Sequence, residues 1–253
     1  MKNNTYLAAD FGGGSGRIVA GTISNGKLHI EEIHRFTNRL VQLGKHIYWD
    51  FPCLFQDMKE GMRLAAKQGL RINGIGVDTW GVDFGLIDRN GNLLGNPVSY
   101  RDKRTVGIPE KVFDIISKSE HYRRTGIQAM PINTLFQLYS MLLEDNPQLT
   151  IADRLLFMPD LFNYFLTGIA ANEYSISSTS ELLNANTHTW DTDLLSQLKI
   201  PQHLFGEIRQ PGTILGKLKK EIAKETGLDE IDVITVGSHD TASAIAAIPA
   251  SGE

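Results

Sequence analysis

A glycine-rich stretch near the start of the chain contains residues whose types and spacing could bind phosphate. Residues 8–22 read AADFGGGSGRIVAGT, so an aspartate, three glycines, a serine, another glycine and an arginine separate two apolar runs. Glycine has no Cβ, so a turn built from it can adopt a positive φ and lets an anion approach its backbone N–H groups. This composition favours a phosphate-binding turn; the alternative is an ordinary glycine-rich hairpin.

Two well-known glycine-rich phosphate loops do not fit this spacing. A P-loop needs G-x-x-x-x-G-K-[ST], and no lysine lies at that position. A dinucleotide loop needs G-x-G-x-x-G before a helix, whereas Arg17 occupies the third glycine position and a strand follows. The remaining design is a hairpin turn whose N–H groups form an anion nest.

Three polar side chains accompany these glycines. Ser15 could add a hydroxyl donor, and Arg17 could either add charge or pair with a neighbouring side chain. Asp10 ends the first expected strand and could hold Mg²⁺, usually through water.

A second polar cluster follows a buried strand near the end of the sequence. Residues 232–248 read DVITVGSHDTASAIAAI, in which Gly-Ser-His-Asp-Thr precedes a run of small, helix-forming residues. Asp240 could act as a general base on a substrate hydroxyl, and His239 could hydrogen-bond the substrate. The competing interpretation is helix capping, since Asp and Thr are good N-cap residues.

A third segment, residues 72–88, reads INGIGVDTWGVDFGLID. Gly81 follows a bulky aromatic residue, which suggests that another group approaches the backbone closely. Trp80 could stack on a sugar or belong to the core. The charged run of residues 100–104 could bind hydroxyls or be solvated.

Strand ends must bring these segments together. Strands are expected at residues 6–9, 18–23, 27–36, 72–77 and 232–236, with Asn25-Gly26 as a hairpin signal and a second hairpin joining 82–88 to 93–100. Helices are expected at residues 51–69, 108–117, 134–144, 160–166, 194–198, 215–226 and 241–247. This order predicts an α/β domain whose mixed sheet opens in a β-meander and carries helices on both faces.

Composition excludes several classes of protein. The 253 residues are 42% hydrophobic and 21% charged, which is typical of a globular protein with one large or two small domains. A net charge of -4 argues against a nucleic-acid partner, and no apolar run approaches the roughly 18 residues that cross a membrane. A single cysteine, Cys53, forms no internal disulfide and fits a reducing, cytoplasmic location.

Taken together, these segments resemble the FGGY family of carbohydrate kinases, which have the actin-like ATPase (ribonuclease H-like) fold. AADFGGGSGR is similar to the family's first phosphate loop, GIGVDTWGVDFGLID to its second core segment, and VGSHDTASA to the segment with the catalytic aspartate. YRDKRT, MPDLFNYFLTG and EYSISSTSELLN resemble landmarks between them, so the similarity is collinear over essentially the whole chain. DTWGVDF and TGIQAMPINTLFQL are most similar to the rhamnulokinase branch.

The resemblance implies Mg²⁺-dependent transfer of the ATP γ-phosphate to the C1 hydroxyl of L-rhamnulose. It assigns phosphate binding to Gly13, Gly14, Ser15, Gly16 and Arg17, sugar binding to Gly81, His239, Asp240 and Thr241, the role of base to Asp240, and a place near the metal to Asp10.

Family members have two domains of similar size with the active site between them. The resemblance therefore implies that residues 1–253 are the N-terminal domain, that the C-terminal nucleotide-binding domain is absent from this chain, and that the chain alone has little kinase activity. The alternatives are another ketose kinase of the family, such as an L-fuculokinase, and a non-catalytic sugar- or nucleotide-binding module on the same fold. A glycosidase using Asp78 and Asp240 is disfavoured, because that chemistry has no use for a phosphate nest.

Overall fold

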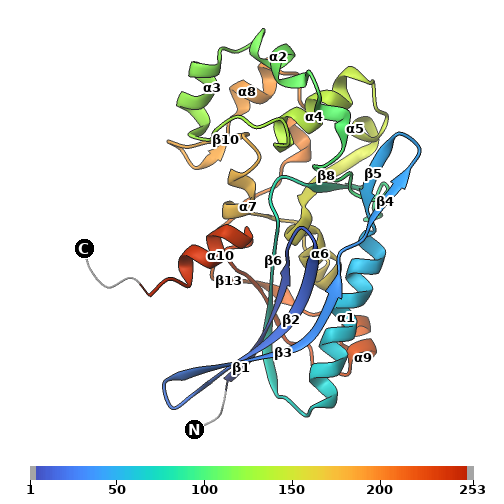
Figure 1. Cartoon of the computed structure of the whole chain (residues 1–253), viewed down its shortest axis with the longest axis vertical. Helices are drawn as coiled ribbons and strands as arrows, with labels where there is room; N and C mark the ends of the chain where they lie inside the picture. Colours follow the sequence, from blue (N-terminus) through green and yellow to red (C-terminus); the bar gives the residue numbers. More distant parts are fainter. Residues whose placement is uncertain (1–3, 250–253) are drawn as a thin grey trace.

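The computed structural model describes residues 4–249, in which a central sheet carries a lobe of short helices at one end (Figure 1). The sheet has six strands in the order β13 (Thr213–Lys217), β14 (Asp232–Thr235), β6 (Ile72–Thr79), β1 (Asn4–Phe11), β2 (Ser15–Ser24) and β3 (Lys27–Thr37). β14, β6 and β1 are parallel, and the outer pairings are antiparallel. The predicted mixed sheet with an opening meander is confirmed.

The turn between β2 and β3 forms as its sequence predicts. Asn25 and Gly26 have φ values of 50° and 73°, so both central residues adopt the left-handed conformation of a type I′ hairpin turn. Asparagine and glycine tolerate this conformation better than other residues, so this short signal fixes the register of the meander.

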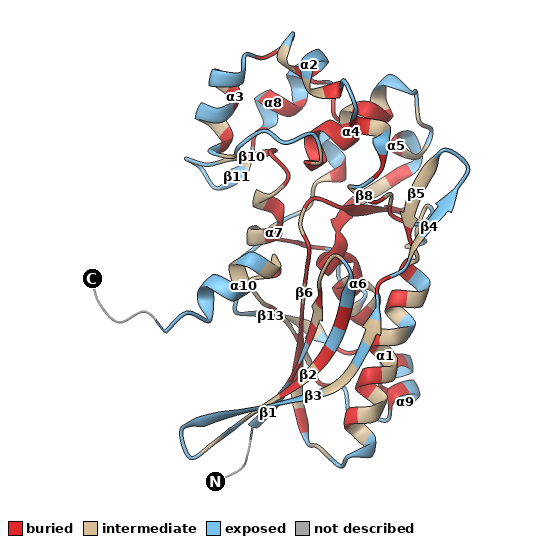
Figure 2. Ribbon diagram, in the orientation of Figure 1, coloured by how far each residue is buried: buried red, intermediate tan, exposed pale blue. Residues whose placement is uncertain are grey.

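Three helices cover one face of the sheet: α1 (Phe51–Lys67), α6 (Met158–Thr167) and α9 (Lys220–Thr226). Inward-facing residues of β1 alternate with outward-facing ones, and Phe11 stacks on Phe162 of α6 with ring centroids 4.3 Å apart. On the other face, the short α10 (Asp240–Ala246) contacts β6. Helices thus lie on both faces, but the second face is far less covered (Figure 2).

The helical lobe has its own core around β7 (Phe84–Asp88) and β8 (Ala152–Phe157). The predicted hairpin of 82–88 with 93–100 forms only around its turn, where Ile87 bridges Leu93 and the Leu94 N–H donates to the Leu86 carbonyl at 2.8 Å, whereas the regular ladder of β7 is with β8. Pro97 lacks an N–H group, which weakens the 93–100 segment as a ladder strand. The helices of the lobe are α2 (Ile108–Phe113), α3 (Lys118–Thr125), α4 (Thr134–Leu143), α5 (Gln148–Ile151), α7 (Tyr174–Ser178) and α8 (Thr192–Gln197).

Short elements complete the chain. They are the hairpin of β4 (Leu40–Leu43) and β5 (His46–Trp49), the paired β9 (Asn172–Glu173) and β12 (Ile208–Arg209), the paired β10 (Leu183–Asn184) and β11 (Thr189–Trp190), and 3₁₀ turns at Lys103–Thr105 and Gln202–Leu204. The helix expected at 215–226 is shorter, because residues 213–217 form β13 and α9 begins at Lys220. Among residues 4–249, no helix combines the length and apolar character needed to cross a bilayer.

Candidate active site

The carboxyl ends of three adjacent parallel strands bring the predicted site residues to one edge of the sheet. In the strand register, Asp10 of β1 lies opposite Asp78 of β6, and Thr79 of β6 bridges to His239 just beyond β14. The Thr79 N–H donates to the carbonyl oxygen of Ser238 at 2.9 Å. The glycine turn after β1 and the Asp240 segment after β14 therefore share an edge, which is where open α/β folds bind ligands.

The carbonyl groups of the glycine turn accept hydrogen bonds, the Gly12 N–H donates to the Ser15 carbonyl at 2.9 Å, and the next two amides are free among the described residues. Asn38 donates its side-chain amide to the Gly12 carbonyl and its backbone N–H to the Gly14 carbonyl at 3.1 Å. Arg101 donates from Nη2 to the Gly13 carbonyl at 3.1 Å. The N–H groups of Gly13 and Gly14 donate to no residue between 4 and 249. Exposed amides with fixed carbonyls are the features of an anion nest.

The expectation that this turn uses positive φ angles is wrong. None of Gly12, Gly13, Gly14 and Gly16 is among the glycines with positive φ. The steric argument for glycine remains at two positions. A Cβ on Gly13 would lie 3.0 Å from the Tyr100 hydroxyl, and one on Gly16 would lie 2.3 Å from the Phe36 ring.

Carboxylates gather beside the turn. Arg17 pairs with Asp10 through Nη2–Oδ2 at 2.6 Å and Nε–Oδ2 at 2.8 Å, which is the neighbour pairing that the sequence left open. Burial, and then the negative charges of Asp10 and Asp240, raise the pKa of Asp78 to about 7. The single guanidinium of Arg17 only partly offsets this acidic charge, so the strand ends suit a cation.

The residues present fit a hydrated divalent cation better than a fully protein-ligated one. Within residues 4–249, no three acidic, histidine or cysteine side chains are close enough to hold one ion together. Mg²⁺ usually keeps several waters and binds one or two carboxylates plus substrate phosphates. Asp10, about 30% exposed at its side chain, is suited to that mode.

Asp240 presents a partly exposed carboxylate at the start of α10. Its side chain is 40% exposed, and its Oδ1 accepts from the Thr241 N–H at 2.6 Å and the Thr241 hydroxyl at 3.1 Å. His239 Nε2 lies 3.4 Å from the same oxygen. The N-cap residue of α10 is His239, whose side chain makes no capping bond. Asp240 Oδ2 has no hydrogen-bond partner among residues 4–249 and is available to a substrate.

Gly81 lies beside this carboxylate segment and has little space around it. A Cβ at Gly81 would lie 3.2 Å from Thr179 Cγ2 and 3.4 Å from His239 Nε2. The sequence motifs indicate Gly81 and His239 but not Thr179, which follows α7 and is far from both in sequence.

The residue after Gly81 adopts a strained backbone conformation. Val82 has φ 68°, and the Asp83 N–H donates across it to the Gly81 carbonyl at 2.9 Å, which is a classic γ-turn. Such a conformation is rare for a β-branched residue and persists only when its surroundings hold it. The Val82 N–H donates to Thr179 Oγ1 at 3.0 Å, and Thr134 Oγ1 donates to the Val82 carbonyl at 2.7 Å.

The aromatic and charged residues near this turn are structural. Trp80 is 5% exposed and stacks on Trp49 with centroids 4.1 Å apart, so its core interpretation is correct. Both indole N–H groups donate to the buried Asp83. In the 100–104 run, Arg101 supports the glycine turn and Asp102 pairs with His46.

Residues 5–247 match the family model described as the FGGY family of carbohydrate kinases, N-terminal domain. The chain belongs to the FGGY family of carbohydrate kinases. It is 46% identical to a rhamnulokinase from Bacteroides thetaiotaomicron over 99% of this chain and 51% of the relative. It is 43% identical to a rhamnulokinase from Oceanobacillus iheyensis, covering 96% of this chain and 52% of the relative. The chain thus spans about half the length of the curated relatives it matches.

Solved structures of other kinases share the fold at low sequence identity. A gluconate kinase from Lactobacillus acidophilus superposes with a TM-score of 0.84 at 21% identity, over 94% of this chain and 48% of that one. A glycerol kinase from Plasmodium falciparum gives 0.77 at 16% identity, over 92% and 48%. The actin-like fold predicted from the family resemblance is therefore confirmed.

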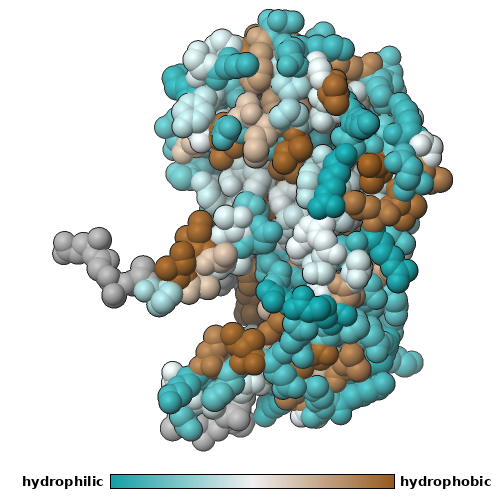
Figure 3. Space-filling model, in the orientation of Figure 1, coloured by the Kyte–Doolittle hydropathy of each residue, from teal (hydrophilic) through white to brown (hydrophobic). Residues whose placement is uncertain are grey.

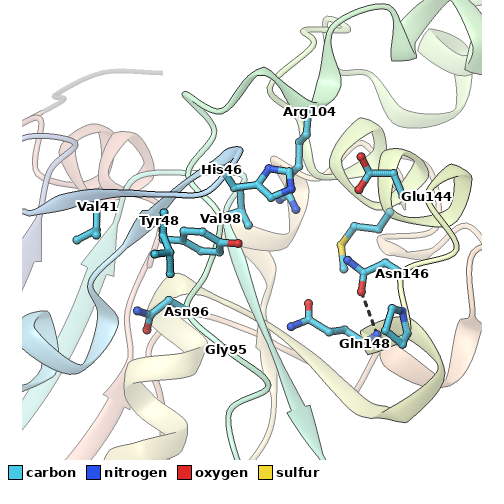
Figure 4. A pocket seen from close by; sticks show the side chains of 13 residues that line it. Val41, His46, Tyr48, Gly95, Asn96, Val98, Arg104, Glu144, Asn146 and Gln148 are labelled. Carbon is cyan, nitrogen blue, oxygen red and sulfur yellow. Dashed lines mark hydrogen bonds between the residues drawn. The ribbon is translucent and has the colours of Figure 1, made fainter.

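A separate cavity of about 470 Å³ lies between the β4–β5 hairpin and the C-terminal end of α4 (Figure 4). His46, Tyr48, Arg104, Glu144 and Gln148 are among the side chains that line it. None of the predicted site residues lines it, so the candidate active site is the edge formed by the strand ends.

Proposed function

We propose that this chain is the N-terminal half of a sugar kinase that transfers the ATP γ-phosphate to the C1 hydroxyl of L-rhamnulose. One observation carries the reaction type: a turn with unoccupied amides and an accessible carboxylate, Asp240, at the same edge of the sheet. The names of the relatives support L-rhamnulose as the substrate. A C-terminal half, as in those relatives, would supply the nucleotide-binding domain. The single cysteine, Cys53, supports a reducing, cytoplasmic location.

The proposed mechanism uses positioning and electrostatics. Phosphoryl transfer needs in-line alignment and charge stabilisation more than covalent chemistry. The amides from Gly13 to Gly16, with Ser15 and Arg17, would hold the γ-phosphate. Bound Mg²⁺, held through water by Asp10, would supply further neutralisation of phosphate charge.

The sugar side of the proposal rests on the segment after β14. Gly81, His239 and Thr241 would bind the ketose and orient its C1 hydroxyl toward Asp240. Asp240 would accept the hydroxyl proton as transfer proceeds, because a carboxylate positioned on the reacting hydroxyl can act as a general base.

The test is ADP release by the full-length protein with L-rhamnulose, L-fuculose and D-xylulose as acceptors. We expect the highest kcat/KM with L-rhamnulose. Asp240→Asn should lower kcat by about 10²–10⁴-fold, the usual contribution of a general base, and leave ketose binding measured by calorimetry unchanged. The control is Asp229→Asn, an exposed carboxylate whose side chain makes no hydrogen bond with residues 4–249.

Each outcome separates the alternatives. A preference for L-fuculose would favour an L-fuculokinase, and ketose binding without turnover would favour a non-catalytic module. Turnover that survives in Asp240→Asn would remove Asp240 as the base. The 253-residue chain alone should turn over little, because half of the site cannot exclude water or hold the nucleotide.

A further inference from the structure

A fully buried carboxylate, Glu173, lies behind the segment that contains Asp240. It ends β9 and is the N-cap residue of α7, with no exposed surface. Its oxygens accept from the N–H groups of Ser175 at 2.8 Å and Ile176 at 3.0 Å. These two bonds are what an N-cap requires.

Glu173 also accepts hydrogen bonds from Ser238, which is not part of the helix that Glu173 caps. Its Oε2 accepts from the Ser238 hydroxyl at 2.5 Å and from the Ser238 N–H at 3.3 Å. The Ser175 hydroxyl donates to Glu173 at 2.6 Å and accepts from the His239 N–H at 3.2 Å. The two residues directly before Asp240 are therefore tied to Glu173 and to its hydrogen-bonded neighbour.

These bonds to the 238–239 turn come from β9 and α7, which lie outside the six-stranded sheet. On the sheet side, the turn has the bond from the Thr79 N–H to Ser238 and the bridge to His239. β14 itself ends at Thr235, so no regular ladder continues to Asp240. Strand β6 and Glu173 thus hold the turn between them.

We propose that Glu173 is a positioning residue that fixes the Ser238–His239 turn and so directs the Asp240 carboxylate toward the reacting hydroxyl. Small displacements of a reacting group reduce rates strongly, because catalysis depends on near-attack geometry. The effect on kcat rests on the proposed function. The effect on the order of the turn does not depend on it.

The experiment compares Glu173→Gln with a matched control in the full-length protein. Glutamine keeps the shape but replaces one acceptor oxygen with an NH₂ donor, which cannot accept from Ser238 or Ser175. The control, Asp191→Asn, alters another buried N-cap carboxylate, which accepts from the Leu194 N–H at 2.9 Å and bonds to Arg124 and Asn184. We expect both variants to lower the melting temperature, and only Glu173→Gln to lower kcat, by about tenfold or more.

Amide hydrogen exchange supplies a readout that requires no substrate. In Glu173→Gln, the amides of residues 238–241 should exchange faster, and in Asp191→Asn they should not. The KM for ATP should stay unchanged in Glu173→Gln, because Asn38 and Arg101 hold the glycine turn independently of this network. Ser238→Ala removes the hydroxyl bond but not the helix cap, so it should lower kcat with little change in melting temperature.

The outcomes are distinct. Unchanged exchange at residues 238–241 in Glu173→Gln overturns the positioning role, as does a loss of kcat no larger than in Asp191→Asn. If Glu173→Gln does not fold, normal kcat and normal exchange in Ser238→Ala overturn it. If the wild-type protein phosphorylates no ketose, the proposed function fails, and exchange at residues 238–241 still decides whether Glu173 orders the turn.

Discussion

Gly81 leaves little room for a side chain beside Thr179 and His239. A methyl group there would lie 3.2 Å from Thr179 Cγ2, so Thr179 must shift by a few tenths of an ångström, and it would contact His239 Nε2 at 3.4 Å. Because both border the proposed sugar site, Gly81→Ala in the full-length protein should raise the KM for the ketose by roughly 10–100-fold, the usual effect of one methyl group in a pocket. Steady-state kinetics would measure this.

A second substitution tests whether that contact is the cause. Thr179→Ser removes Cγ2 but keeps Oγ1, which accepts from the Val82 N–H at 3.0 Å. The double variant Gly81→Ala/Thr179→Ser should recover part of the lost affinity for the ketose. A double variant as impaired as Gly81→Ala alone would show that the methyl group acts elsewhere.

Asp78 should make stability depend on pH. Its pKa is raised to about 7 in the folded chain by burial and by the charges of Asp10 and Asp240, against an ordinary value of 3.8. The folded state holds the proton more tightly than the unfolded state, so the stabilising contribution is complete below about pH 4 and is lost as the pH rises through about 7. Asp78→Asn should stabilise the chain at pH 8 by roughly 1–3 kcal/mol and have little effect at pH 4. Urea unfolding at the two pH values would measure it, and equal effects at both would contradict the assignment.

At the scale of elements, α1 packs closely against β2 at Gly61, where the backbone of the helix lies next to Ile18. A Cβ there would lie 2.2 Å from Ile18 Cγ1 and 2.7 Å from Ile18 Cβ. Alanine gains about 1 kcal/mol of helix propensity over glycine, whereas overpacking a core costs about 1–3 kcal/mol and more when the neighbour cannot move. Ile18 is β-branched and fully buried, so we expect the cost of overpacking to exceed the gain in helix propensity. Gly61→Ala should therefore lower the free energy of unfolding by about 1–3 kcal/mol.

Removing the neighbour tests this balance. Ile18→Ala alone should cost about 2–5 kcal/mol through the cavity that it creates. In the double variant, the new methyl group enters that cavity, so the loss should be smaller than the sum of the two single losses. Additive losses in urea unfolding would mean that the two residues do not compete for the same space.

The sequence predicts elements whose structure is set by neighbouring residues, and it fails where contacts between distant residues set the structure. Asn25-Gly26 determines its own turn, and α1 follows from apolar spacing alone. The partner of β7 could not be predicted locally, because β8 lies about 70 residues further along the chain and an intervening segment offered a nearer match. The same limit applies at the site: motifs indicated Asp240 and Gly81, but Glu173 reaches Ser238 across 65 residues and Thr179 reaches Val82 across 97.

Across the whole molecule, the sheet has one well-covered face and one that is largely open. Outward-facing side chains of the first three strands include Tyr6, Ile23, Leu28 and Ile30, and Ile30 is 70% exposed. With Val236 and neighbours they border an apolar hollow of about 450 Å³, and Figure 3 shows apolar surface both on these strands and on α10. A contiguous apolar surface of this kind usually marks an interface. The chain spans about half the length of these relatives, so the C-terminal half proposed above is the partner that we expect to pack on this face.

If a second half covers this face, the same double substitution should have different effects on stability in the 253-residue chain and in the full-length protein. In the 253-residue chain, Leu28→Lys/Ile30→Lys replaces side chains that are already largely in solvent, so it should reduce binding of an apolar dye and self-association without lowering the free energy of unfolding by more than about 0.5 kcal/mol. In the full-length protein, the same lysines would be buried without partners, and unfolding should become easier by several kcal/mol, on the order of 2–5. Glu31→Lys, an exposed position in the same strand that does not line the hollow, changes the net charge by the same two units and is the control for charge. A double substitution that is neutral in both lengths of chain would mean that the second half leaves this face of the sheet open.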